Sequence, residues 1–296
     1  MGKIFLLVGC LLAAASAAQG QGIADRCVRD SLVHQGMMRS YYVHVPERLA
    51  PEAQLLIVLH GYTGNAEGQK VQLVDLAEEM GFAVCFPQGL RDPKGKTSWN
   101  VGYPSQEGME TDDVDFLETL VRALQARYGL DPRNAFLSGM SNGGEMCYLT
   151  ARRKPDLFAG IISIAGLTLS SMEPLRYEGA VPFMEVHGTA DKTSYWTGDY
   201  NNRYGWGAYL AVPAAVGYVV AADGCRGYVR TDATAGGKRV TRHRYYGGVP
   251  ARNGQGPSCE VWLYEVDGGG HSWADTEFDV YHEMGRFIRR FSYPKD

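Results

Sequence analysis

A run of five consecutive apolar residues, Leu55-Leu56-Ile57-Val58-Leu59, restricts the possible folds more than any other feature of this chain. A strand with one face in water alternates apolar and polar side chains, whereas an unbroken apolar run is typical of a strand buried on both faces. Such a strand needs a covering layer on each side. Further core strands are predicted over residues 83–86, 134–138, 160–165, 182–186 and 261–266.

Helical patterns separate these strands. The clearest helix has a capping residue at Thr111 or Asp112, acidic residues in its first turn and Gly129 at its end. Strands that alternate with helices predict an α/β fold, in which helices cover both faces of a mostly parallel sheet. The other helices are predicted over residues 69–80, 142–152 and 278–291.

Two regions fall outside this alternation. Residues 31–45 predict a β-hairpin that turns near Gly36. Residues 194–250 form an insertion before the last core strand, and this insertion is rich in tyrosine, tryptophan and glycine. The chain has 296 residues, which is enough for one large domain with a substantial core even after a leader is removed. We therefore expect a single α/β domain over residues 21–296.

Residues 1–20 have the pattern of a secretory signal peptide. Lys3 supplies a positive charge, an apolar run follows, and Ala15-Ser16-Ala17 offers a cleavage site. The run is too short for a confident membrane span, so the predicted location is secreted or periplasmic. The alternative is a lipid anchor on Cys10, because Leu7-Val8-Gly9-Cys10 resembles a lipoprotein box. Without that lipid, no membrane association is expected.

Net charge and cysteine content narrow the choice of partners and cross-links. The formal net charge is −4, so a nucleic-acid partner is not indicated. Five cysteines remain after the leader, and export permits disulfides among them. Cys225 and Cys259 lie in the same late segment and are the candidate pair. Cys85 and Cys147 lie in apolar segments and are expected to be buried thiols.

A glycine-rich turn carries the strongest chemical signal. Gly139-Met140-Ser141-Asn142-Gly143-Gly144 follows a predicted strand and opens a predicted helix, which is the context of a nucleophile elbow. In such a turn the serine hydroxyl projects beyond the carboxyl end of the sheet, where the helix N-terminus favours developing negative charge. Ser141 is therefore the predicted catalytic nucleophile.

A serine nucleophile needs a base, and the base needs an acid that orients it. In a fold of this kind the base lies on the loop after the last core strand, and of seven histidines only His271 has that position. Asp191 is the first acid after the preceding core strand and is predicted to accept the Nδ1 proton of His271. Asp199 is the reserve candidate for this acid.

The negatively charged oxygen of an acyl-transfer intermediate needs N–H donors. His60-Gly61-Tyr62 follows the first buried strand, where this fold places half of the oxyanion hole. The other half comes from the residue after the nucleophile. The backbone N–H groups of Tyr62 and Asn142 are therefore the predicted pair.

Several of these segments together resemble one known family. Leu59-His60-Gly61, Gly139 to Gly144, His187-Gly188-Thr189-Ala190-Asp191 and Gly269-Gly270-His271-Ser272-Trp273 resemble the polyhydroxybutyrate depolymerase and feruloyl esterase superfamily of secreted α/β-hydrolases, which includes carbohydrate esterase family one. Ser98-Trp99-Asn100 and Asp112-Asp113-Val114-Asp115-Phe116 also resemble its pattern. The resemblance extends from about residue 38 to the end. One departure is Ala274-Asp275 after Trp273, where the family often has Pro-Gly.

The resemblance implies an α/β-hydrolase fold and a secreted serine carboxylic ester hydrolase. Its substrate would be a feruloylated or acetylated plant polysaccharide, or the oligosaccharides derived from it. A cysteine pair like Cys225 and Cys259 also occurs in the family. The sequence has no zinc-binding or phosphate-binding motif, so no metal ion or cofactor is expected.

Aromatic residues are the candidates for the substrate pocket, since planar rings stack on phenolic acyl groups and on sugars. The candidates are Trp273 beside the base, Trp99, and Trp196 and Trp206 in the insertion. The alternative interpretation is that the rings of the insertion only pack it onto the core. The alternatives for function are a polyester depolymerase, an acyltransferase with the same triad, and a non-catalytic binding protein of the same fold.

Overall fold

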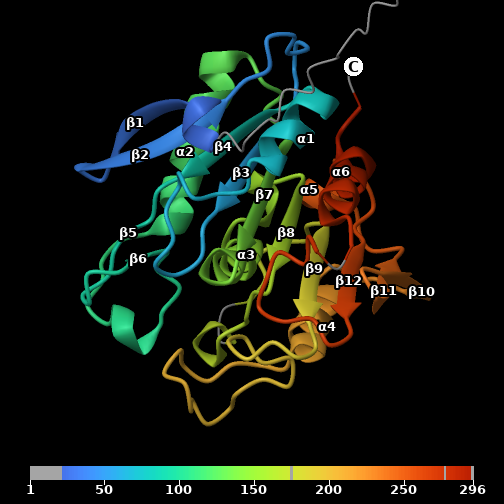
Figure 1. Cartoon of the computed structure of the whole chain (residues 1–296). Helices are drawn as coiled ribbons and strands as arrows, with labels where there is room; N and C mark the ends of the chain where they lie inside the picture. The colour runs from blue at the N-terminus through green and yellow to red at the C-terminus, as the bar shows by residue number, and fades with distance from the viewer. Residues whose placement is uncertain (1–21, 174–175, 277, 295–296) are drawn as a thin grey trace, which may run out of the picture.

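A computed structural model describes residues 22–173, 176–276 and 278–294. The predicted signal peptide, with Cys10, lies outside the described residues. The described chain forms a ten-stranded sheet with the order β1-β2-β4-β3-β7-β8-β9-β12-β11-β10 (Figure 1). The six strands from β4 to β12 in this order are parallel, and an antiparallel hairpin is added at each edge. The sheet is therefore mostly parallel, as its apolar runs predict.

The strands of this sheet follow the predicted segments closely. β3 spans the apolar run Leu55–Leu59 with every residue buried, and the N-terminal hairpin is formed by β1 and β2. The sheet strands are β1 (Val28–His34), β2 (Met37–His44), β3 (Leu55–Leu59), β4 (Ala83–Pro87), β7 (Ala135–Met140), β8 (Gly160–Ile164), β9 (Phe183–Gly188), β10 (Gly227–Ala235), β11 (Lys238–Tyr246) and β12 (Val261–Val266).

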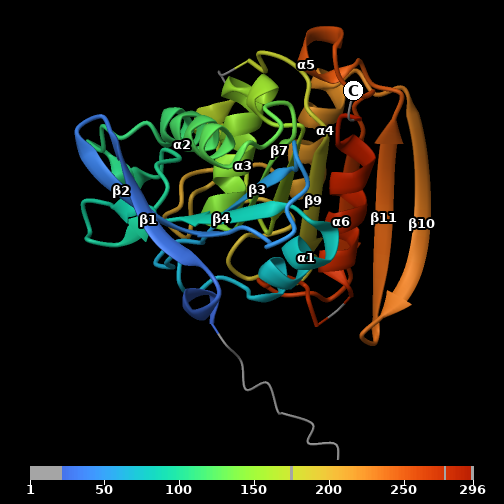
Figure 2. The same cartoon turned by 90° about the horizontal axis from the view of Figure 1, so that it is seen from above.

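Helices cover both faces of the sheet, as Figure 2 shows from above. One face packs against α2, α3 and α4, and the other face against α1 and α6, so that the core consists of two main apolar layers. The cap of α2 is Asp112, whose carboxylate accepts from the N–H groups of Val114 and Asp115, both at 3.1 Å. The helices are α1 (Gln72–Met80), α2 (Asp113–Tyr128), α3 (Asn142–Arg153), α4 (Val212–Ala222), α5 (Ala251–Gly254) and α6 (Val280–Phe291).

The insertion contains more regular structure than its sequence indicates. After β9 the chain forms long loops, which lie at one end of the sheet in Figure 1, and then α4. It continues into β10 and β11, which pair with each other and extend the sheet beyond β12. Most side chains of β10 are exposed, so no apolar run marks this strand in the sequence.

Residues 88–110, which have no clear pattern, contain a short pair of strands and a single 3₁₀ turn. The pair is β5 (Leu90–Arg91) with β6 (Thr97–Ser98), and the turn covers Pro104–Gln106. Within the described ranges, no helix is long and apolar enough to cross a membrane, and no group of three or more His, Cys, Asp or Glu side chains could hold a metal ion.

Candidate active site

Ser141 occupies a strained turn between β7 and α3. Its φ of 55° and ψ of −120° are unfavourable for a residue with a side chain, and such strain is typical of functional turns. The turn is tight: a Cβ atom on Gly139 would lie 2.4 Å from the carbonyl group of Gly143, and one on Gly143 would lie 2.6 Å from the carbonyl oxygen of Leu59. Only glycine fits at these two positions, and together they hold Ser141 beside the end of β3.

His271 and Asp191 are joined across two neighbouring parallel strands. Asp191 follows β9, His271 follows β12, and Nδ1 of His271 lies 2.7 Å from Oδ2 of Asp191. The other carboxylate oxygen accepts from the N–H groups of Thr193 at 2.7 Å and Ser194 at 2.8 Å. Burial alone would raise the pKa of Asp191, but these bonds and the bond to His271 outweigh burial and lower it. Asp191 is therefore an ionised acceptor that orients the imidazole.

Ser141 and His271 line the same cavity of about 270 Å³. Apart from Glu145 on α3, their neighbours in its wall come from loops after β3, β6, β8 and β9, so the cavity lies at the carboxyl end of the sheet. The lining residues are Tyr62, Thr63, Tyr103, Ser141, Glu145, Leu167, Thr193, Ser194, Trp206 and His271.

The predicted oxyanion donors lie around the nucleophile. A Cβ atom on Gly61 would be 3.4 Å from the Cβ atom of Ser141, so the loop carrying Tyr62 passes next to the serine. The N–H groups of Tyr62 and Asn142 have no hydrogen-bond partner within the described ranges. Both are therefore free to donate to a substrate oxygen.

The side chain of Asn142 fixes the start of α3. Its amide accepts from the N–H of Trp99 at 2.7 Å and donates to the carbonyl oxygen of the same residue at 3.1 Å. The indole of Trp99 in turn donates to the carbonyl oxygen of His60 at 2.9 Å. Trp99 thus connects the two loops that carry the predicted oxyanion donors.

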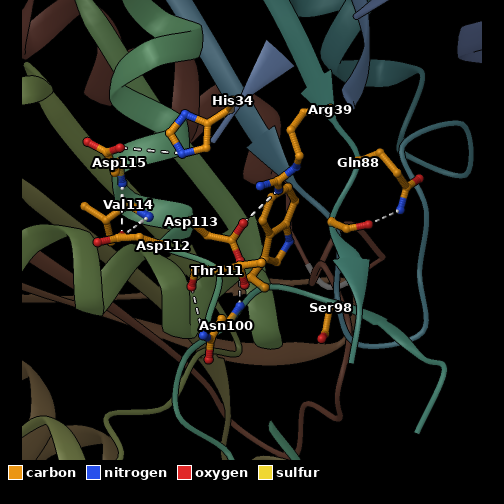
Figure 3. Close-up of polar contacts among 12 residues, drawn as sticks. His34, Arg39, Gln88, Ser98, Asn100, Thr111, Asp112, Asp113, Val114 and Asp115 are labelled. Atoms are coloured by element: carbon orange, nitrogen blue, oxygen red, sulfur yellow. Dashed lines mark hydrogen bonds and ion pairs between the residues drawn. The ribbon is translucent and has the colours of Figure 1, made fainter. Parts of the chain in front are cut away.

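A buried ion pair anchors this connection to the sheet (Figure 3). The guanidinium group of Arg39 on β2 lies 2.7 Å from Oδ1 of Asp113, and the other oxygen of Asp113 accepts from the N–H of Asn100 at 2.7 Å. Both charged side chains are fully buried, and the guanidinium group also lies 3.7 Å from the centroid of the Phe116 ring. Residues 98–100, which resemble the family pattern, therefore have a structural role: they hold the loops around Ser141 in place through hydrogen bonds.

Among the four tryptophans predicted to form the pocket, only Trp206 lines the cavity. Its ring lies 5.3 Å from that of Tyr62 and 5.2 Å from that of Tyr103, measured between centroids, so that three rings form one wall. This corrects the prediction for Trp99 and Trp273, which are buried in the two core layers, and for Trp196, which packs against the core and His187.

Two further sequence expectations concern a cysteine pair and the reserve acid. Cys225 and Cys259 are free thiols in the structure, with the sulfur of Cys225 3.8 Å from the carbonyl oxygen of Cys259, so the pairing of these two cysteines stays a prediction. Asp199, the reserve acid, uses its carboxylate within its own loop and accepts from the N–H groups of Asn201 and Arg203. It therefore does not take the place of Asp191.

Two buried acids near the site were not predicted from the sequence. Glu145 lines the cavity one turn after Ser141, and Glu185 lies 2.9 Å from Nδ1 of His187. Burial raises the pKa of Glu185. Burial alone would lower the pKa of His187, but its hydrogen bond to Glu185 outweighs this effect and raises it. For Glu185, the signal in the sequence was an acidic residue inside an apolar strand. For Glu145, it was an acidic residue on a buried helix face.

The family match covers the first part of this site. Residues 39–195 match the sequence profile of the family described as "Esterase PHB depolymerase", and these 157 residues are just over half of the chain. The chain belongs to this family. The match includes Ser141 and Asp191 and ends before His271, and it agrees with the resemblance based on the sequence motifs.

Curated relatives match just over half of the chain. "Putative esterase NocK" from Nocardia uniformis is 32% identical over 168 residues, which cover 54% of this chain and 47% of that protein. "Probable acetylxylan esterase A" from Neosartorya fischeri is 28% identical over 177 residues, which cover 56% and 47%. The chain thus spans about half the length of the curated relatives that it matches.

Solved structures support the α/β-hydrolase fold. An acetyl xylan esterase from Aspergillus awamori has a TM-score of 0.56 and 17% sequence identity, with 88% of this chain and 98% of that chain covered. The esterase PE8 has a TM-score of 0.54 and 16% identity, with 84% and 97% covered. At such low identity these likenesses establish the fold and not the substrate.

Proposed function

We propose that this chain is a serine esterase that hydrolyses carboxylic esters through Ser141, His271 and Asp191. The observation that carries the proposal is the shared cavity: a strained serine and a histidine held at 2.7 Å by a buried aspartate face the same space. This combination is what nucleophilic acyl transfer requires. Membership in an esterase family supports the same conclusion.

In the proposed reaction, the hydroxyl oxygen of Ser141 attacks the ester carbonyl carbon while Nε2 of His271 takes its proton. The negative charge on the former carbonyl oxygen is stabilised by the N–H groups of Tyr62 and Asn142. Collapse of this intermediate breaks the bond to the alcohol, which leaves with the proton from His271. Water then attacks the acyl-serine by the same route, releases the acid and regenerates the serine. Asp191 stabilises the imidazolium form of His271 in both halves.

We propose acylated plant polysaccharide as the substrate, with acetyl groups as the leading candidate for the acyl part. The names of the matched relatives, acetylxylan esterases among them, support this choice. The test is release of acetate from acetylated xylan by the purified protein, with Ser141→Ala as the matched inactive variant. Clearing of a polyhydroxybutyrate film without release of acetate would favour the polyester alternative. A wild-type protein that a fluorophosphonate probe does not label would indicate a binding protein.

Release of feruloyl groups is the second candidate, and the ring wall formed by Tyr62, Tyr103 and Trp206 favours it. Stacking of a planar acyl group on such a wall contributes roughly 0.5–1.5 kcal/mol beyond buried area. Under this candidate, methyl ferulate has a higher kcat/KM than methyl butyrate, and Trp206→Ala reduces the ratio by about threefold to tenfold. Trp273→Ala, which alters a core residue outside the wall, is the control and leaves the ratio unchanged.

We also propose that residues 1–20 direct export and are removed. The sequence pattern supports this, and the protein collected outside the cytoplasm should begin between residues 18 and 22 when analysed by mass spectrometry. Metabolic labelling with a fatty acid separates this outcome from a lipid anchor on Cys10.

A further inference from the structure

Glu145 is a buried acid in the wall of the catalytic cavity. It lies on α3, four residues after Ser141, and only 1% of its surface is exposed. Its Oε2 atom is buried and has no hydrogen-bond partner within the part of the chain that the structure describes. A buried polar atom without a partner costs roughly 1–3 kcal/mol. An acid in the wall of a substrate cavity therefore has capacity for one more hydrogen bond.

The surroundings of Glu145 determine its charge. Burial raises its pKa to about 8, against the smaller, opposite effects of the Tyr103 hydroxyl and the Asn142 amide. The titratable groups that line the same cavity are Tyr62, Tyr103 and His271, and no lysine or arginine is among its lining residues in the described chain. Near neutral pH the group is thus mostly a carboxylic acid, which can both donate and accept a hydrogen bond.

The position of Glu145 relative to Ser141 limits which part of a substrate it can contact. Ser141 precedes the first residue of α3, the N–H of Glu145 donates to the carbonyl oxygen of Ser141 at 2.9 Å, and both residues line the same cavity. When Ser141 is bonded to the ester carbon, Glu145 can therefore contact only groups a few bonds from that carbon. An acetyl group has no polar atom at this distance apart from its carbonyl oxygen. A hydroxylated acyl chain, or a sugar hydroxyl next to the esterified position, has one.

We propose that Glu145 is a specificity-determining residue that hydrogen-bonds a hydroxyl group close to the reacting carbonyl of the ester. This inference rests on the proposed esterase function and adds the chemical class of substrate to it. The hydroxyl belongs either to the acyl part or to the alcohol part of the ester, and both sources share the same chemistry at Glu145.

The test uses two pairs of esters of matched shape. Methyl 3-hydroxybutyrate against methyl 3-methylbutyrate compares a hydroxyl with a methyl group on the acyl side. 2-Hydroxyethyl butyrate against propyl butyrate makes the same comparison on the alcohol side. Wild-type protein should prefer the hydroxylated member of one pair in kcat/KM by about fivefold to tenfold, which is the usual effect of one such hydrogen bond. The pair that shows the preference identifies the side.

Variants separate Glu145 from the rest of the cavity. Glu145→Gln retains a donor and an acceptor and should keep most of the preference. Glu145→Leu has a similar shape and no polar atom, so the ratio should fall to about one. If Glu145→Leu does not fold by circular dichroism, Glu145→Asp replaces it, because the shortened side chain should also lower the ratio.

The outcomes also separate this inference from the proposed function. p-Nitrophenyl acetate has no hydroxyl group, so its hydrolysis by the wild type and the loss of hydrolysis in Ser141→Ala test the esterase alone. If that activity is present while neither ester pair shows a preference, the role of Glu145 is overturned and the esterase stands. A preference that persists unchanged in Glu145→Leu or Glu145→Asp also overturns it.

Discussion

Two histidines, His187 near the end of β9 and His271 in the loop after the neighbouring strand β12, differ in their exposure to solvent and in their hydrogen bonds. His187 is the next-to-last residue of β9, is fully buried, and has both ring nitrogens engaged, one with Glu185 and one with the carbonyl oxygen of Ser194 at 2.7 Å. The side chain of His271 is 21% exposed and contacts Asp191 through Nδ1 alone, on the wall of the cavity.

Both histidines approach the same atom. Oδ2 of Asp191 lies 2.7 Å from His271 and 3.6 Å from Nε2 of His187. A base must be able to exchange a proton with a substrate, and only a ring with a nitrogen free toward the cavity can do so. Residue type and a position near the end of a core strand are therefore not sufficient for a histidine to act as a base. We propose that a ring nitrogen free toward the cavity that Ser141 lines suits His271 to act as the base, and that His187 instead supports Asp191 structurally.

The largest effect should come from removing the reacting groups. Ser141→Ala and His271→Ala should each reduce kcat for p-nitrophenyl acetate by about 10⁶-fold, and the double variant should be scarcely worse, because the two groups act as a unit. Stopped-flow and long-time assays measure this range. Retention of a tenth of wild-type activity in Ser141→Ala would exclude it as the nucleophile.

Removing the negative charge of Asp191, which both histidines approach, should cause the next largest loss of kcat. Asp191→Asn should reduce kcat on the order of 10⁴-fold, because an amide stabilises the wrong tautomer of His271. The matched control is Asp199→Asn, which changes an acid of the insertion that serves its own loop. Equal losses of kcat in the two variants would contradict the assignment of the acid.

His187→Gln should reduce the stability of the protein more than its rate, in contrast to the variants of Ser141, His271 and Asp191. It leaves Glu185 buried without its partner, so the free energy of unfolding should fall by about 3 kcal/mol in urea denaturation. The loss in kcat should stay below about a hundredfold, because only the support of Asp191 is affected. His271→Gln should do the opposite, with little change in unfolding free energy and loss of nearly all activity.

A double variant tests the cause of that instability. Glu185→Gln added to His187→Gln removes the buried charge, and part of the lost stability should return. If His187→Gln were instead as inactive as His271→Ala and fully stable, the two histidines would not differ in the way described.

The last prediction concerns Glu145 and depends on pH. Its pKa in the folded chain, about 8, is above its ordinary value of 4.5. Between these pH values the folded state therefore binds more protons than the unfolded state. Its contribution to stability is complete below pH 4.5 and is lost as the pH rises toward 8, by at most about 1.4 kcal/mol for each pH unit. Glu145→Gln should lack this slope in denaturation measured from pH 5 to pH 8.

The value of kcat/KM should depend on the same titration of Glu145. Ionised Glu145 would place a negative charge within one helical turn of the developing oxyanion, so kcat/KM of the wild type should fall above about pH 8. Glu145→Gln should lack this alkaline decline. Glu79→Gln, which changes an exposed acid of α1 on the opposite face of the sheet, is the control for loss of a carboxylate. A decline that is identical in all three proteins would refute the assignment.

Much of the fold could be predicted from the sequence because the signals are local. The unbroken apolar run of β3 and the cap of α2 at Asp112 appear in the structure at the predicted residues. The hairpin of β10 and β11 could not be predicted, because the side chains of β10 are mostly exposed and the place of the hairpin is decided by the pairing of β11 with β12. The short strands β5 and β6 have only two residues each, too few for a periodic pattern.

The order of the chemical groups could be established from local sequence alone: a serine between a strand and a helix, an acid after β9 and a histidine after β12. Each of these lies in a turn whose glycines and flanking elements can be identified within a few residues. Tertiary structure alone decided which side chains share the cavity. Trp206 and Glu145 line it while Trp99 and Trp273 do not, because contacts between distant segments determine which side chains face the cavity.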